Sequence, residues 1–159
     1  LHNEAMREMM PSKKKLDEYY MSLALRVAEL SHGRRARVGC CLVTDNDLTV
    51  LGTNGLPKQL GNELEYDENY KFCNFGDGTL KTKNEVIHAE LNTILKCAKE
   101  GVSVKGATIY TTLSCCSQCA SMLASCGVKR VVYLQEYRDT KGIEVLKQCG
   151  IIVEKLEAL

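Results

Sequence analysis

Apolar positions recur at helical spacing near the start of the chain. Between residues 12 and 32 they repeat every three or four residues, which predicts a helix with one apolar face. The repeating positions are Leu16, Tyr19 or Tyr20, Leu23, Val27 and Leu30. Ser12 has a side chain suited to capping the start of this helix, and Gly33 suits its end.

Shorter apolar runs then predict the beginning of a sheet. Residues 37–44 and 48–54 are separated by the polar turn Asp-Asn-Asp, which predicts a β-hairpin. Residues 55–84 are rich in Gly, Asn and charge and have no steady period. Irregular segments of this length inside a small domain are usually functional or mobile, and we expect an irregular insertion that covers another part of the molecule.

Helical and strand-like patterns alternate over the rest of the chain. Helices are expected at residues 85–100, 116–126 and 139–149, and strands at 106–113, 128–134 and 151–156. Alternation of this kind after a hairpin predicts an α/β protein with a mixed sheet. We therefore expect one domain over residues 1–159, a three-layer α/β/α fold around a five-stranded sheet.

Composition removes several classes of function. The net charge is only +1, which gives little long-range attraction to nucleic acid. No apolar run approaches the roughly 20 residues that span a bilayer, and the N-terminus lacks a signal-peptide core. We expect a cytoplasmic protein (host cytoplasm if a phage encodes it) with no membrane or nucleic-acid partner. Without a secretion signal, the nine cysteines favour metal binding or reactive thiols over disulfides.

One set of residues carries the candidate chemistry. His88 and Glu90 open one expected helix, and Cys116 and Cys119 open another as C-x-x-C. Both helices are expected to begin at the same edge of the sheet, so an imidazole and two thiolates would meet there as three zinc ligands. Catalytic zinc sites keep the fourth position for water. Glu90 stands at the wrong distance along the helix to act as a ligand and suits a base beside that water.

The order H-x-E, about 25 residues, then C-x-x-C is a zinc-deaminase signature. At "HAELN" and "TLSCCSQCA" the chain resembles the cytidine deaminase superfamily, in particular the deoxycytidylate (dCMP) deaminases. The resemblance runs from about residue 20 to 155 and includes "RVGCCLV", "GTNGLP", "GATIYTTL" and "GVKRVVYLQEY". It implies hydrolysis of dCMP to dUMP, which supplies thymidylate synthesis.

The resemblance also implies roles for individual residues. Water attacks C4 of cytosine, and Glu90 takes the water proton and delivers it to N3. Glu90 then supplies another proton to the amino group, which departs as ammonia. The Ala89 N–H would bind the base carbonyl, and the Ser114 carbonyl would bind the amino group. The expected contacts to sugar, nucleotide and phosphate are Asn54, Tyr137 and Arg37, respectively.

Regulation is a further implication of the resemblance. Many dCMP deaminases are hexamers that dCTP activates and dTTP inhibits, with Mg²⁺ on the triphosphate. The corresponding effector site would include Gly52, Asn54 and Gly55 of the "GTNGLP" loop. Lys99 stands where a relative has arginine. Lysine carries a point charge, whereas the guanidinium of arginine can form two parallel hydrogen bonds. The stretch "HGRRAR" offers no cysteine for a second, structural zinc, so we expect one zinc ion per subunit.

The cysteines next to the motif and elsewhere need separate interpretations. Cys115 stands where the family usually has proline, and Cys116 remains the expected ligand because it alone keeps the two-residue gap to Cys119. The other cysteines within expected strands and helices are interpreted as small core residues: Cys40, Cys41, Cys97, Cys126 and Cys149. The sequence assigns no role to Cys73 in the insertion.

Alternative functions remain open at this point. Free-cytidine deaminases usually have cysteine in place of His88, and tRNA adenosine deaminases lack the long insertion. Polynucleotide deaminases bring basic grooves and aromatic stacking platforms, whereas this chain has no tryptophan. Activity on dCTP is a further alternative. A non-catalytic zinc module that binds nucleotide is the alternative of another class, and Glu90 argues against it.

Overall fold

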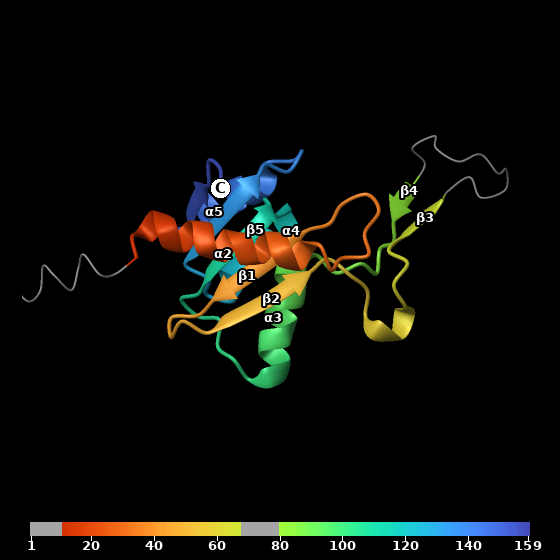
Figure 1. Cartoon of the computed structure of the whole chain (residues 1–159), viewed down its shortest axis with the longest axis horizontal. Helices are drawn as coiled ribbons and strands as arrows, with labels where there is room; N and C mark the ends of the chain where they lie inside the picture. Colours follow the sequence, from red (N-terminus) through yellow and green to blue (C-terminus); the bar gives the residue numbers. More distant parts are fainter. Residues whose placement is uncertain (1–10, 68–79) are drawn as a thin grey trace, which may run out of the picture.

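The molecule is built on a five-stranded sheet in the order β2-β1-β5-β6-β7 (Figure 1). The structure is a computed structural model that describes residues 11–67 and 80–159. The strands are β1 (Gly39–Val43), β2 (Thr49–Thr53), β5 (Thr108–Leu113), β6 (Arg130–Gln135) and β7 (Ile152–Lys155). β1 pairs antiparallel with β2 and β5, whereas β5, β6 and β7 run parallel. The predicted hairpin and mixed sheet are confirmed.

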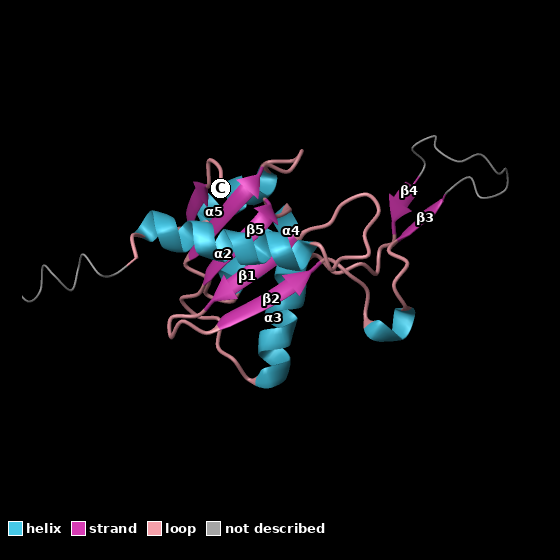
Figure 2. Cartoon of the chain, in the orientation of Figure 1, coloured by secondary structure: helices cyan, strands magenta, loops and turns pink. Residues whose placement is uncertain are grey.

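Helices cover both faces of this sheet (Figure 2). α2 (Lys13–Ala28) lies on one face, and α3 (Ala89–Glu100), α4 (Ser117–Ser125) and α5 (Lys141–Gln148) lie on the other. Side chains of β1 point alternately into the two cores: Cys41 and Val43 face α2, and Cys40 and Leu42 face the other three helices. The predicted three-layer α/β/α fold is confirmed.

The first helix differs from its prediction in both length and buried face. Ser12 caps it as expected, because its Oγ accepts the N–H of Lys15 at 3.2 Å. The helix ends at Ala28 and not near residue 32, and Leu30 is 73% exposed. Its buried stripe consists of Asp17, Met21, Ala24 and Ala28. The expected apolar face is confirmed only in part: Tyr20 and Leu23 pack against the core, but the buried stripe also includes an aspartate.

The helix expected at residues 85–100 begins four residues later, at Ala89. The residue two positions before it, Ile87, forms an antiparallel β-bridge with Gly55. The N–H of Ile87 donates to the carbonyl of Gly55 at 2.9 Å, and the N–H of Gly55 donates back at 3.0 Å. His88 is consequently the N-cap residue of α3 and lies just outside the helix.

The segment 55–84 contains more regular structure than its composition predicts. A 3₁₀ turn covers Lys58–Leu60, and the strands β3 (Glu65–Asp67) and β4 (Leu80–Thr82) pair antiparallel. We call this two-stranded sheet the arm, because it stands apart from the main sheet (Figure 1). The prediction that 55–84 is irregular throughout was wrong. Cys73 lies outside the described residues.

Two glycines permit close packing around the sheet. A Cβ on Gly39 of β1 would collide with the carbonyl oxygen of Ala24 in α2. A Cβ on Gly142 of α5 would collide with the carbonyl oxygen of Cys115, just before α4. The second contact sets how closely α5 packs against the residues at the start of the C-x-x-C motif.

The cysteines outside the motif divide by burial. Cys40, Cys41 and Cys97 are buried, as predicted for core residues. Cys126 is half-buried and Cys149 is exposed, so the core interpretation of Cys149 was wrong. Over residues 11–67 and 80–159, none of the helices combines the length and apolarity needed to cross a membrane.

Candidate metal centre and active site

Two helix N-termini bring the candidate ligands together. α3 starts after His88 and α4 starts after Cys116, and both of these residues are in extended N-cap conformations. The Cys116 thiol serves as the cap of α4, because its Sγ accepts the N–H of Cys119 at 3.5 Å. The sequence thus places a nitrogen donor and a sulfur donor at the positive ends of two neighbouring helices.

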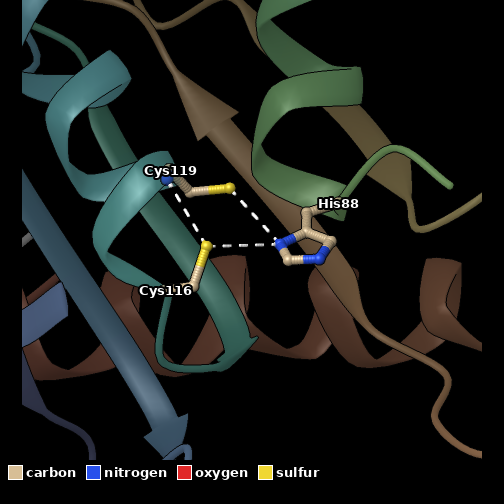
Figure 3. Close-up of side chains that lie close together, drawn as sticks. All are labelled: His88, Cys116 and Cys119. Carbon is tan, nitrogen blue, oxygen red and sulfur yellow. Dashed lines mark hydrogen bonds between the residues drawn. The ribbon is translucent and has the colours of Figure 1, made fainter. Parts of the chain in front are cut away.

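The three donor atoms converge on one point (Figure 3). His88 Nδ1 lies 3.5 Å from Cys116 Sγ and 3.4 Å from Cys119 Sγ. All three donor atoms lie within 4.8 Å of one another. The predicted ligand set His88, Cys116 and Cys119 is therefore assembled, and Figure 3 shows the imidazole turned toward both thiols.

This donor set fits a zinc ion. Zinc binds sulfur at about 2.3 Å and nitrogen at about 2.0–2.1 Å, so a tetrahedral site separates the two kinds of donor by about 3.6 Å. The separations of 3.4 and 3.5 Å lie close to that value. Three protein ligands leave one position of a tetrahedral ion open, which is typical of catalytic and not of structural zinc.

The titration of the cluster also suits a cation. A hydrogen bond from the Cys119 thiol, joined by one from His88, lowers the pKa of Cys116 well below that of an ordinary thiol. The same hydrogen bond, with burial, raises the pKa of Cys119. A bound metal ion would take both sulfurs as thiolates and displace their protons.

Glu90 lies beside the cluster without joining it. Its carboxyl is 3% exposed, and burial raises its pKa above that of an ordinary glutamate. The hydroxyl of Thr111 donates to Glu90 Oε1 at 3.2 Å and also reaches the Leu113 carbonyl at 2.8 Å. A raised pKa makes the carboxyl hold a proton more readily than an ordinary glutamate does, which suits a group that takes and returns protons.

A cavity of about 290 Å³ opens over these groups. Glu90, His88 and Cys116 lie in its lining, together with four of the predicted substrate contacts: Asn54, Ala89, Ser114 and Tyr137. Ser114 is held to the next loop, because its Oγ accepts the N–H of Tyr137 at 2.8 Å. The structure therefore gathers most of the predicted residues around one cavity.

Asn54 is already engaged by the protein itself. Its Oδ1 accepts the hydroxyl of Ser31 at 2.8 Å and the N–H of Val38 at 2.9 Å, and its Nδ2 donates to the carbonyl of Ala36 at 3.0 Å. These bonds fix the loop from residue 31 to 38 against the end of β2. Asn54 therefore has a structural role in this wall of the cavity.

Other predicted residues lie away from the cavity lining. Arg37 donates from Nε to the carbonyl of Gly33 at 3.2 Å and is not among the residues that line the cavity. Gly52 is packed beneath α3, where a Cβ would collide with the hydroxyl of Thr93. Lys99 stands in the last turn of α3, at the opposite end of the helix from His88.

Three residues that the sequence reasoning missed contribute to the site. Arg35 and Arg138 line the cavity and give it two guanidinium groups, and Thr111 contacts Glu90. The stretch "RRAR" at residues 34–37 contains three arginines, and the sequence does not show which of them faces the cavity. Arg138 directly follows Tyr137, which was a predicted substrate contact, so its position in the sequence could have indicated that it lies near the site. Nothing in the local sequence marks Thr111.

Comparisons with known proteins agree with this geometry. A family model described as the cytidine and deoxycytidylate deaminase zinc-binding region matches residues 14–135. The deoxycytidylate deaminase of Saccharomyces cerevisiae is 34% identical over 140 residues, which are 87% of this chain and 44% of that protein. The deoxycytidylate deaminase of Mus musculus is 32% identical over 127 residues, 78% of this chain and 67% of that protein. The chain thus spans less than half of the yeast relative.

A solved structure of the same kind extends the comparison to the fold. The dCMP deaminase from the cyanophage S-TIM5, in complex with dCMP and dUMP, superimposes with a TM-score of 0.75 at 35% identity. The match covers 92% of this chain and 100% of that one.

Proposed function

The chain belongs to the cytidine and deoxycytidylate deaminase family, and on that premise we propose that it hydrolyses dCMP to dUMP and ammonia. The observation that carries the proposal is a buried carboxyl, Glu90, beside the His88, Cys116 and Cys119 cluster on the wall of a cavity. A non-catalytic zinc module has no need of a proton carrier at that point.

The proposed cofactor is one zinc ion per subunit, held by His88, Cys116 and Cys119. When bound, zinc lowers the pKa of water toward about 7 and so supplies a nucleophile at neutral pH. The residues of the chain account for the remaining steps. Glu90 takes a proton from the attacking water, passes it to N3 of the cytosine ring, and transfers a second proton to the amino group as ammonia departs from C4.

Backbone groups around Glu90 are suited to orient the base. Ala89 is the first residue of α3, so its N–H has no acceptor within the helix and can bind the base carbonyl. Ser114 follows β5 and lines the same cavity, where its carbonyl can accept the amino group. Asn54 and Tyr137 line the cavity beyond these residues, and we assign them to the sugar and the nucleotide.

The arginines of the cavity suit a phosphorylated substrate. Arg35 and Arg138 are both in its lining, and a guanidinium binds phosphate through two parallel hydrogen bonds. We therefore assign the 5′-phosphate contact to these two residues in place of Arg37. A free nucleoside offers no anionic group to either arginine.

Absorbance during incubation of the zinc-loaded protein with dCMP, dCTP and cytidine tests the proposal. We expect turnover of dCMP above the other two, and a loss of at least about 100-fold in kcat for Glu90→Gln with zinc content unchanged at one per chain. Turnover of dCTP alone would identify dCTP as the substrate in place of dCMP. Zinc binding without turnover of any of the three would favour the binding module.

Regulation by triphosphates forms a second part of the proposal. The resemblance to dCMP deaminases supports a cytoplasmic homohexamer that supplies dUMP for thymidylate synthesis, with dCTP as activator, dTTP as inhibitor and Mg²⁺ on the triphosphate. Gly52, Asn54, Gly55 and Lys99 are the proposed effector contacts. Gly55 pairs with Ile87, the residue before His88, so a shift of this loop would reach a metal ligand. Turnover that stays hyperbolic and ignores both triphosphates would contradict this part.

A further inference from the structure

A buried glutamate at the root of the arm has no place in the mechanism above. Glu65 is the first residue of β3 and is only 4% exposed. It faces the loop from residue 33 to 37, which carries Arg35 to the cavity. A buried carboxylate is unfavourable unless its charge is satisfied, so its contacts indicate what it does.

One oxygen of Glu65 holds two successive backbone groups. Oε1 accepts the N–H of Arg34 at 2.9 Å and the N–H of Arg35 at 3.0 Å. Among the described residues, Oε2 accepts no hydrogen bond and has only the Arg34 guanidinium nearby, with Nε at 3.8 Å. The carboxylate therefore binds the loop mainly through its main chain, at the residue whose side chain lines the cavity.

The arm holds the side chain of Arg35 as well. Arg35 Nη1 donates to the hydroxyl of Thr82 at 3.2 Å, and both residues line the cavity. Thr82 is the residue of β4 directly opposite Glu65 in the antiparallel register. One cross-strand pair of the arm thus fixes the backbone of Arg35 through one member and its guanidinium through the other.

We propose that Glu65 is a positioning residue for phosphate recognition: it holds Arg35 where a nucleoside 5′-monophosphate needs a cation. This inference rests on the proposed function for the identity of the ligand. Asn54 fixes the far end of the same loop through Ala36 and Val38, so the loop is held from both sides. An arginine that is already in place loses less entropy on binding, which strengthens recognition of the phosphate alone.

Binding measurements separate this role from catalysis. Calorimetric titration of the zinc-loaded protein gives dissociation constants for dUMP and for deoxyuridine, which lacks the phosphate. We expect Glu65→Ala to weaken dUMP binding about tenfold and to leave deoxyuridine binding within about twofold. Glu65→Gln keeps an oxygen for the two N–H groups, so we expect it to stay within about threefold of the parent for dUMP.

Two further variants keep the result interpretable. Glu63→Ala removes an equal charge from an exposed position nearby and should leave both constants unchanged. If Glu65→Ala does not fold, Thr82→Val at an exposed position removes only the hydroxyl that binds Arg35, and we expect it to weaken dUMP binding about threefold or more without affecting deoxyuridine.

Equal weakening of both ligands by Glu65→Ala, or of neither, would overturn the inference. So would a parent protein that binds dUMP no better than deoxyuridine. A parent that binds dUMP in this selective way but never deaminates dCMP would overturn the proposed activity and leave the role of Glu65 standing.

Discussion

The hydroxyl of Thr111 has two acceptors, Glu90 and the carbonyl of Leu113. It is the contact that holds the carboxyl of Glu90 from the side of the sheet. We expect Thr111→Val, which keeps the shape and removes the hydroxyl, to lower kcat for dCMP about tenfold, since one hydrogen bond is worth about 1 kcal/mol. Binding of dUMP and zinc content should change little. Steady-state kinetics and metal analysis measure these quantities.

Thr112 provides a matched control for this prediction. Its hydroxyl accepts the N–H of Gly39 at 3.1 Å and does not contact Glu90. Thr112→Val should lower the free energy of unfolding while kcat stays near that of the parent. If both variants lose the same share of kcat, the effect of Thr111 is one of general stability and not of carboxyl orientation.

At the scale of residues, the sequence predicts the positions of site residues that are close together in the chain. His88 and Glu90 are two residues apart and Cys116 and Cys119 three apart, so local helix starts place each pair. Arg35 could not be selected over Arg37 in this way. Its orientation depends on Glu65 and Thr82, which are 30 and 47 positions away in the chain.

At the scale of elements, α2 and β6 are joined by a buried ion pair. Asp17 Oδ2 lies 2.6 Å from Arg130 Nη2, and the side chains are 9% and 11% exposed. Burial alone would raise the pKa of Asp17, but hydrogen bonds from Arg130 and Tyr110 outweigh it and lower the pKa below the usual value. The aspartate that disrupted the predicted apolar stripe of α2 is therefore part of its attachment to the sheet.

This pair should make stability depend on pH in one direction. Because the pKa of Asp17 is lowered by folding, its contribution is fully present above the unfolded value of about 3.9 and is lost as the pH falls through the folded value. We expect Asp17→Ala to lower the free energy of unfolding at pH 7 by about 3 kcal/mol, since Arg130 stays buried with Glu154 as its remaining carboxylate.

Urea unfolding at pH 7 and at pH 3 measures this effect. The difference between parent and variant should shrink at the lower pH. A difference that is equal at both pH values would assign the loss to packing and not to the charge of Asp17.

The boundaries of elements were the least predictable feature. The start of α3 was misplaced because Ile87 pairs with Gly55, 32 positions earlier in the chain. α2 ends early because Ser31, inside the predicted helix, turns its hydroxyl to Asn54. In both cases a residue from another part of the chain determines where the helix begins or ends. The local spacing of apolar residues does not reveal that residue.

At the scale of the molecule, the proposed zinc ion would link two helices from distant parts of the chain. Removing it with a chelator should therefore lower the melting temperature as well as the activity. A ligand at about 1,000 times its dissociation constant stabilises by about 4 kcal/mol, which corresponds to roughly 10 °C for a domain of this size. Calorimetry with and without added zinc tests this.

Cys116→Ser is the appropriate comparison, because it removes one of the three ligands. Its melting temperature should already be low and should not fall further with chelator. A parent protein whose melting temperature is the same with and without zinc would contradict the proposed link between the two helices.

The arm is a point of the fold where the length of the chain can change. The chain leaves the body through β3 and returns through β4, and Asp67 and Leu80 are paired opposite each other. A segment between paired ends can vary in length at a low entropic penalty, and loops at such points tolerate exchange. We therefore expect changes of length between Asp67 and Leu80 to leave the main sheet and the His88, Cys116 and Cys119 cluster in place, while the pair of Glu65 and Thr82 keeps the two strands in register.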